Sequence, residues 1–561
     1  MKFKNIKISN FRNYEYINVQ LENKNVFFGM NDVGKTNFLY AIRYVFDKEV
    51  RKNNFLDTDF YQRNIDKPIE ITVCIDISDT TDLDNEKLRA KVKGAISSNQ
   101  DWVYIKLVAN YDEKEMIANP ILYWGGDIKN LQEIKAKGYF FEIDRVFNVV
   151  YIDAYVDLHT LFKKNINVLL KNDDTADKNK LEHIDKTIAD LNQSIASLSG
   201  IKNFEERVSP EYNSFRHEKV AVSVKSEIAV NGLYSNVAPY IKKEGSDNLY
   251  PTSGEGRKKL LVYSIYDLLA EESSERKINL FLIEEPENHL HRAMQLALSH
   301  RIFVDEKYKY TFMTTHSSFV LAEMDKVNLV RIYNKDKIDS SSSFYTVPEE
   351  YAKQKQRLNK GLADAIFADK VLLVEGPSEE VLFDKVFSTI NEFYEIDGIF
   401  ILQAGGFGFK PYAKILEELK IPYVIKTDND LRKAKGKTDY SVIGFSRVNG
   451  IIKRDVLPED RISDNTVEAK RKLYDANRAA LDTIRSKDHV YLSHVSLEED
   501  LDEVIHDEMI AYLPEANGDV IKYLQDAKKY HMVELVEKLT NEDCEKIYNH
   551  YNFACLEDIM K

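Results

Sequence analysis

A loop between a hydrophobic strand and an amphipathic helix near the N-terminus constrains the fold of this chain most. In KNVFFGMNDVGKTN, Gly29, Gly34, Lys35 and Thr36 have the Gly-x4-Gly-Lys-Ser/Thr spacing of a phosphate-binding loop. Such glycines let backbone N–H groups wrap a polyphosphate, the lysine adds a positive charge, and the threonine hydroxyl ligates Mg²⁺. Apolar residues of the next segment share one helical face: Phe38, Leu39, Ile42, Val45 and Phe46. The segment therefore predicts nucleotide phosphates bound at a helix N-terminus.

Three later segments complete the predicted ATP site. The strand INLFLIEEPE (278–287) ends in Glu284, expected to hold the Mg²⁺ shell, and Glu285, expected to orient the attacking water. The turn TSGEGRKKL (252–260) opens a helix, and FMTTHSS (312–318) ends a strand at His316, a candidate γ-phosphate sensor. Each segment alone is also typical of ordinary turns and polar residues, but their order favours a nucleotide site. The predicted nucleotide-binding residues are Asn31, Gly34, Lys35, Thr36, Asn37, Ser253, Gly254, Gly256, Glu284, Glu285 and His316.

Residues 1–330 resemble the ABC-type ATPases of SMC, RecF and OLD proteins. Ser253–Gly256 resembles the signature motif, EEPE with Leu290 and His291 resembles the Walker B motif and D-loop, and His316 resembles the switch histidine. The resemblance implies that the signature of one subunit completes the phosphate-binding loop of another. Glu284 stands where the family usually has aspartate, and its extra methylene is expected to leave Mg²⁺ within reach.

A helical insertion separates the phosphate-binding loop from its partner motifs. Between about 157 and 217, apolar residues recur at alternating spacings of three and four: Leu181, Ile184, Ile188, Leu191, Ile195 and Leu198. The stripe predicts either an intramolecular helical hairpin or a dimerisation element, and the pattern alone does not choose between them. The segment EKVAVSVKSEIAV (218–230) returns to strand alternation.

The last third of the chain predicts a second α/β unit. Strands in 369–375, 399–405 and 421–428 alternate with helical segments, which implies a parallel sheet. Ligands of such sheets bind at the carboxyl ends of the strands. That rule gathers Glu375, Gly405, Asp428 and Asp430 at one edge, with Glu379 one turn into the following helix. Glu379 has an ordinary explanation too, because acidic residues favour helix N-termini.

An edge of carboxylates suits Mg²⁺ or Mn²⁺ better than zinc, and such ions support phosphodiester chemistry. HVYLSHVSLEED (489–500) is predicted to be a further strand ending in acids, and either Glu498 or Asp500 is a candidate ligand. Lys528 is a candidate to stabilise phosphate charge, although it and these acids are also typical of surface charge. The predicted metal ligands are Glu375, Glu379, Asp428, Asp430, Glu498, Asp500 and, with the nucleotide, Thr36. The predicted catalytic residues are Glu375, Asp428, Asp430, Lys528 and Glu285.

Glu375-x3-Glu379, the glycines and Asp428-x-Asp430 resemble a Toprim domain. An ABC-type ATPase with a helical insertion, followed by a C-terminal Toprim domain, is the arrangement of OLD-family nucleases. GMNDVGKTNFLYA, YPTSGEGRK, LIEEPE, EGPSE, IKTDNDL and MVELV closely resemble the nuclease subunits of Gabija anti-phage systems. This resemblance implies a metal-dependent DNA endonuclease regulated by nucleotide. It also implies a homotetramer arranged as a dimer of dimers, a UvrD-like helicase partner, and a match of Lys528 to a lysine of the catalytic region.

The expected domain organisation is an ATPase formed by 1–156 and 218–345, a helical insertion at 157–217, and a Toprim domain with a helical tail at 365–561. A topoisomerase-like Toprim enzyme and a non-catalytic, SMC-like or RecF-like ATP-driven clamp stay open as alternatives.

Composition limits how this chain can contact DNA and where it acts. The 78 lysines and arginines against 92 acidic residues give a net charge of −14, so DNA must meet local basic patches. LRKAKGK (431–437) directly follows the Asp pair, whereas we interpret EAKRK (468–472) as solvated surface charge. The three cysteines predict reduced thiols in a cytoplasmic protein, and no stretch is long and apolar enough for a membrane helix.

Overall fold

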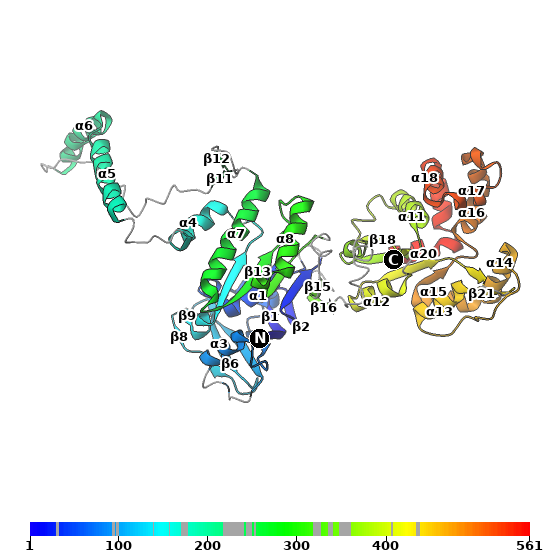
Figure 1. Ribbon diagram of the computed structural model, residues 1–561, viewed down its shortest axis with the longest axis horizontal. Coiled ribbons are helices and arrows are strands. Elements are labelled where there is room, and N and C mark those ends of the chain that lie inside the picture. Colours follow the sequence, from blue (N-terminus) through cyan, green and yellow to red (C-terminus); the bar gives the residue numbers. More distant parts are fainter. Residues whose placement is uncertain are drawn as a thin grey trace.

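The computed structural model describes residues 1–29, 33–92, 96, 100–138, 140–155, 157–169, 178–216, 240–242, 249–251, 254–317, 327–334, 340–346, 361–405, 408–433 and 438–561. Figure 1 shows an N-terminal body with the blue, cyan and green elements, and a C-terminal body with the yellow and red ones. Within the described ranges, no helix is long and apolar enough to cross a membrane.

An antiparallel sheet forms the outer layer of the N-terminal body. Its strand order is β2-β1-β4-β5-β6-β7, and the strands are β1 (Lys2–Phe11), β2 (Tyr14–Gln20), β4 (Ile69–Asp76), β5 (Trp102–Asp112), β6 (Ile117–Gly125) and β7 (Gln132–Glu133). The alternation of apolar and polar residues in β1 explains its place, because Ile6 and Ile8 are fully buried on one face.

The central sheet of this body is mainly parallel. It comprises β10 (Phe147–Ile152), β13 (Ile278–Glu284), β14 (Thr311–Thr314), β3 (Lys24–Phe28), β15 (Asn328–Asn334) and the antiparallel edge strand β16 (Ser340–Thr346), in that order. Helices α1 (Lys35–Phe46), α7 (Glu255–Ser274) and α8 (Arg292–Val304) pack near it (Figure 1). The parallel register aligns Glu284 with Thr314 and Thr314 with Phe27, so the carboxyl ends of β13, β14 and β3 meet at one edge.

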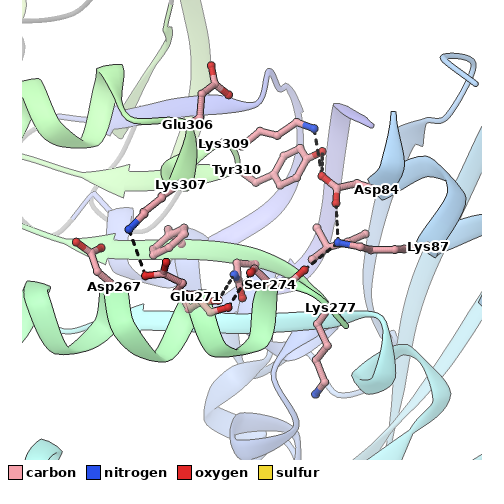
Figure 2. A pocket seen from close by; sticks show the side chains of 14 residues that line it. Asp84, Lys87, Asp267, Glu271, Ser274, Lys277, Glu306, Lys307, Lys309 and Tyr310 are labelled. Atoms are coloured by element: carbon pink, nitrogen blue, oxygen red, sulfur yellow. Dashed lines mark hydrogen bonds and ion pairs between the residues drawn. The ribbon is translucent and has the colours of Figure 1, made fainter. Parts of the chain in front are cut away.

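Smaller elements complete the N-terminal body. They are α2 (Lys48–Arg51), α3 (Leu83–Lys91), β8 (Ala136–Lys137), β9 (Phe140–Phe141), β11 (Tyr240–Lys242) and β12 (Leu249–Pro251). A cavity of 340 Å³ lies where α3, the end of α7 and the amino ends of β13 and β14 come together. Several of its polar side chains pair with one another: Asp84 accepts hydrogen bonds from Lys87, Lys309 and Tyr310, and Lys307 donates to Glu271 (Figure 2). The cavity therefore belongs to the junction between the two sheets and lies away from the phosphate-binding loop.

The insertion is helical, as the periodicity predicted. Helix α4 (Leu158–Leu169) packs against α7, whereas α5 (Lys178–Ala196) and α6 (Ser199–Arg216) project away from the sheets (Figure 1). Leu191 and Leu198 of the stripe are 47% and 57% exposed, so a single chain leaves part of the stripe uncovered. The strand predicted at 218–230 lies outside the described residues.

The C-terminal body has the predicted parallel sheet. Its order is β18 (Ile399–Gln403), β17 (Lys370–Val374), β19 (Tyr423–Thr427) and β22 (Val490–Leu492), all parallel. Its other elements are α11 (Pro377–Ile390), α12 (Lys410–Glu418), β20 (Leu431–Lys433), β21 (Tyr440–Val442), α13 (Ile443–Ile452), α14 (Val467–Ala476), α15 (Arg478–Asp488), α16 (Leu497–Tyr512), α17 (Val520–Asp526), α18 (Lys528–Lys538), α19 (Asn541–Tyr548) and α20 (Ala554–Met560).

The prediction that a strand runs up to Glu498 and Asp500 is wrong. Strand β22 ends at Leu492, and the acids at 498–500 occupy the first turn of α16. Carboxylates are stabilised at that position by the positive end of the helix dipole.

The two bodies share one hydrophobic core. Phe28, at the end of β3, packs edge-on against Phe367 with ring centroids 5.5 Å apart. The buried Arg331 of β15 donates hydrogen bonds to the carbonyl oxygens of Leu419, Lys420 and Ala368. A displacement of β3 or β15 would therefore disturb contacts with the segments that lead into β17 and β19 of the second sheet.

Candidate nucleotide and metal sites

The phosphate-binding loop leaves β3 at Gly29 and enters α1 after Gly34. Both glycines have positive φ, 151° and 100°, a region in which other residues are strained. Lys35 is only 5% exposed and donates a hydrogen bond to the carbonyl oxygen of Gly29, 3.0 Å away, across the loop. Thr36 is exposed on the first turn of α1. Asn31 lies outside the described residues.

The turn between β1 and β2 supports this loop, which sequence patterns did not reveal. Asn13 donates to the carbonyl oxygen of Val33 at 3.0 Å and accepts from Asn37 at 2.9 Å. Arg12 also donates to Asn37, and the Tyr14 hydroxyl donates to the carbonyl oxygen of Gly34. A side chain at position 34 would overlap Asn13, which explains the glycine there. Asn37 thus orients the loop through this turn.

Two adjacent acids at the end of β13 have different surroundings. Glu284 is 8% exposed, its buried Oε1 has no hydrogen-bond partner among the residues that the structure describes, and burial raises its pKa. Glu285, held at a φ of 40°, accepts from His316 Nε2 at 2.8 Å, and this contact lowers its pKa. The unsatisfied oxygen of Glu284 and the oxygen-rich setting suit a hard cation such as the Mg²⁺ that accompanies nucleotide phosphates. Glu284, Glu285, His316 and Lys35 therefore meet at one edge.

The signature segment reaches the same acids from another helix. Gly254 caps α7, and a Cβ at Gly256 would lie 3.2 Å from the carbonyl oxygen of His289. Lys259, one turn further along α7, donates to the carbonyl oxygen of Glu285 at 3.0 Å, and burial lowers its pKa to about 8. Helix α7 is thus tied to the backbone of the catalytic candidate Glu285. Ser253 lies outside the described residues.

A second acidic edge lies in the C-terminal body, where β17 and β19 end side by side. Glu375 follows β17, and its Oε1 accepts from the Thr427 hydroxyl at 2.5 Å and from the Asp428 N–H at 3.0 Å. The backbone N–H of Gly405, at a φ of 55°, donates to the carbonyl oxygen of Glu375. The strand ends predicted to converge do so.

Asp428 is the most electrostatically strained acid of this edge. Burial raises its pKa well above the ordinary value, and the charges of Glu379, Glu375, Glu498 and Asp430 raise it further. Its Oδ1 accepts from the buried hydroxyl of Ser493 at 3.0 Å. Asp430, by contrast, is 45% exposed at the side chain and forms an ion pair with Arg447 at 2.7 Å.

The remaining predicted residues separate into two groups. Burial raises the pKa of Glu379, the charges of Glu375 and Glu498 add to this effect, and the charge of Lys528 opposes it. Asp500 instead forms a fully buried ion pair with Lys426, 2.9 Å long, and accepts from the His494 N–H. The geometry therefore favours Glu498 over Asp500 as a candidate ligand, because the carboxylate of Asp500 already pairs with Lys426.

The donor set fits a divalent metal. Five acids, Glu375, Glu379, Asp428, Asp430 and Glu498, supply only oxygen ligands, the type that Mg²⁺ and Mn²⁺ prefer. Across the described residues, no three His, Cys, Asp or Glu side chains converge closely enough to ligate an ion as they stand. The acids are electrostatically coupled, and Arg447 lies between Glu375 and Asp430. Binding an ion would relieve the mutual repulsion that raises the pKa of Asp428.

Comparisons with known proteins identify the domains in which the two edges lie. A family model described as "AAA ATPase domain" matches residues 1–321, and one described as "Overcoming lysogenization defect protein-like, TOPRIM domain" matches residues 366–430. Endonuclease GajA of Bacillus cereus (strain VD045) is 42% identical over 100% of this chain and 99% of its own length.

The chain belongs to the GajA family of OLD-type nucleases. A second Endonuclease GajA, from Bacillus cereus (strain HuB5-5), is 21% identical over 71% of this chain and 66% of its own length. The OLD nuclease of Thermus scotoductus is 24% identical over 32% of this chain and 35% of its own length. Family membership gives this chain an ATPase domain joined to a Toprim nuclease domain, and implies nucleotide and divalent-metal use in general.

Proposed function

We propose that this protein is an ATP-regulated, Mg²⁺-dependent endonuclease that nicks or cleaves double-stranded DNA in bacterial defence against phage. The observation that carries the proposal is the coupled carboxylate set around Asp428, at the carboxyl edge of a parallel sheet in a GajA-family chain. In a scaffold protein this repulsion would only cost stability, whereas in a metal site the bound cation offsets it.

Each residue of the nuclease edge then has a role. Glu375, Glu379, Asp428, Asp430 and Glu498 would hold one or two divalent ions, with Mn²⁺ as the natural substitute. The ion would supply an activated water and neutralise charge on the leaving oxygen. Lys528, whose charge already acts on Glu379, would stabilise the phosphate. The exposed Arg432 and Lys433, directly after the Asp pair, would position the DNA backbone.

The nucleotide edge would act as a sensor. Lys35, Thr36 and Glu284 would hold ATP and its Mg²⁺, Glu285 and His316 would face the γ-phosphate, and the signature segment would come from a neighbouring subunit. Bound ATP would favour the closed ATPase dimer and restrain cleavage, provided that ATP binds the closed state more tightly than the open one. Depletion of ATP during infection would release the nuclease.

The family resemblance also supports a proposal for the assembly. We propose a homotetramer built as a dimer of dimers, with the domain limits given above, that works in the bacterial cytoplasm with a UvrD-like helicase, GajB. The partly exposed α5 stripe supports a contact between chains at the insertion.

Supercoiled plasmid incubated with the purified protein and Mg²⁺ tests the proposal. Nicked or linear DNA, lost on addition of EDTA, is the expected result. A ladder of topoisomers would show a topoisomerase-like enzyme instead, and unchanged plasmid over the protein range that binds DNA would favour a non-catalytic clamp.

A further inference from the structure

Arg447, on α13, lies inside the acidic edge although no sequence motif marks it. Its guanidinium forms ion pairs with Glu375 and with Asp430, the latter at 2.7 Å. It also donates a hydrogen bond to the Thr427 hydroxyl at 2.5 Å. Arg447 is only 24% exposed at the side chain, so these contacts are not those of a solvated surface cation.

The packing of α13 fixes where Arg447 lies. The first turn of this helix rests on the Asp-Asn-Asp turn, since a Cβ at Gly444 would lie 2.9 Å from the carbonyl oxygen of Asp428. The Gly444 N–H donates to the carbonyl oxygen of Asp430 at 3.0 Å. Near the far end of the helix, the buried Asn449 donates to the carbonyl oxygen of Leu457 and accepts from its N–H. The helix therefore delivers Arg447 to the carboxylates by close backbone contact.

Arg447 and a divalent ion would compete for the same two carboxylates. The Glu375 oxygen that pairs with Arg447 is the one that also accepts from Thr427 and from the Asp428 N–H. Arg447 also pairs with Asp430, which is the second acid of the Asp-x-Asp motif. An arginine is always charged and bridges two carboxylates through its planar fork, so it neutralises part of the repulsion around Asp428.

We propose that Arg447 is a resident counter-ion of the nuclease site that competes with the divalent metal and so sets the metal concentration at which the site loads. This inference rests on the proposed metal site and adds a residue to its regulation. Metal bound to Glu375 and Asp430 would act against the positive charge of the guanidinium that already pairs with them. Arg447 is thus a positioning residue, which holds the acids together without metal and lowers metal affinity.

Binding of Mn²⁺ to the full-length protein, measured by electron paramagnetic resonance without DNA or nucleotide, tests the proposal. Sites present in wild type and absent from Asp428→Asn define the Mn²⁺ bound at this edge. Arg447→Gln should bind this Mn²⁺ with a Kd about tenfold lower than wild type, because a positive charge leaves the ligand set. Arg454→Gln is the matched control, since Arg454 pairs with Asp488 beyond the end of α13, and its Kd should equal that of wild type.

The rise in Tm that Mn²⁺ causes is a second readout, and a merely structural role of Arg447 would not change it. In EDTA, Arg447→Gln should melt below wild type, and Mn²⁺ should raise its Tm by more than it raises that of wild type. Arg447→Lys, which keeps the charge but loses the two-oxygen fork, should have an intermediate Kd, and it replaces the glutamine variant if that variant does not fold.

The outcomes separate the two proposals. Equal or weaker Mn²⁺ binding by Arg447→Gln or Arg447→Lys, relative to wild type, would overturn the role of Arg447 and leave the metal site intact. If wild type and the arginine variants bind no more Mn²⁺ than Asp428→Asn does, the metal site itself is wrong.

Discussion

The nucleotide edge and the nuclease edge both gather acids at the carboxyl ends of parallel strands, but they stabilise those acids differently. At the nucleotide edge, Glu285 pairs with His316, and one buried oxygen of Glu284 has no partner within the described part of the chain. At the nuclease edge, acids repel one another around Asp428, and the single positive charge of Arg447 is shared between two of them. The first edge is arranged around a few directed contacts, whereas the second depends on cations for its electrostatic balance.

Replacement of Asp428 should have the largest effect of any single change and should act with opposite signs on activity and stability. Asp428→Asn should lower plasmid cleavage at least about 1,000-fold, because a metal ligand contributes several kcal/mol to the transition state. The same change should raise the Tm in EDTA, because it removes a charge that its neighbours repel. Gel analysis of plasmid and a thermal melt measure the two effects.

The pH dependence of that stability follows from the raised pKa. The pKa of Asp428 is higher in the folded chain than in the unfolded chain, where it is about 4. Protonated Asp428 therefore contributes favourably to the free energy of unfolding at low pH. That contribution is lost as the pH rises through the raised pKa, and the Tm gain of Asp428→Asn should grow accordingly. The control is Asp439→Asn, in a surface ion pair with Arg461. Cleavage by Asp428→Asn at a wild-type rate would contradict the nuclease assignment.

Glu498 and Asp500 lie two residues apart, but we expect substitution of Glu498 to reduce activity and substitution of Asp500 to reduce stability. Glu498→Gln should reduce cleavage about 100-fold with little change in stability, as expected of a metal ligand. Asp500→Asn should lower the free energy of unfolding by about 3–5 kcal/mol, because Lys426 would stay buried without its partner. Chemical denaturation measures the free energy of unfolding of both variants, and plasmid cleavage assays measure their activity. A stable, inactive Asp500→Asn would reverse the assignment.

ATP binding at the nucleotide edge should require a second chain, whereas metal binding at the nuclease edge should not. Glutamates at both Ile188 and Leu191 should dissociate the oligomer and weaken ATP binding about tenfold, because the stripe would no longer pack between chains. Light scattering and fluorescent-nucleotide titration measure the two results. The matched control is Thr187→Glu with Gln193→Glu, two exposed positions of α5 off the stripe. An unchanged oligomer in the first variant would make the stripe internal to one chain.

The basic residues beside the nuclease edge should have the smallest effect. Arg432→Gln with Lys433→Gln should weaken DNA binding several-fold and reduce the salt dependence by about two phosphate contacts. Lys472, in contrast, already pairs with Glu468 at 2.7 Å, so Lys472→Gln should change neither quantity. Filter binding at several salt concentrations distinguishes the two variants. Equal effects would contradict the proposal that 431–437, rather than 468–472, contacts the DNA backbone.

The sequence predicted the strand ends of both edges, because parallel βα units are encoded in short local patterns. Glu284, Glu375 and Asp428 were found this way. The end of the strand within 489–500 was not predicted, because apolar residues, Val495 and Leu497, continue past the end of β22 at Leu492. Ser496, a favoured residue before a helix, and the acids after it were the available signal that a helix begins.

Contacts made across the tertiary fold could not be predicted from local patterns. Arg447 lies 17 residues beyond Asp430, and only the close approach of Gly444 brings it to the site. Arg12 and Asn13 reach the phosphate-binding loop from a turn that carries no motif. The choice between Glu498 and Asp500 depends on side-chain direction within one helical turn.

The central claim of this account is that the nucleotide edge restrains the nuclease edge, and cleavage at constant free Mg²⁺ tests it most directly. Millimolar ATP should suppress plasmid cleavage by wild type at least about tenfold, which requires a difference of about 1.4 kcal/mol in ATP affinity between closed and open states. Lys35→Ala, which loses the lysine of the phosphate-binding loop, should cut as well as wild type and ignore ATP. Suppression of Lys35→Ala as strong as that of wild type would contradict the coupling of the two edges.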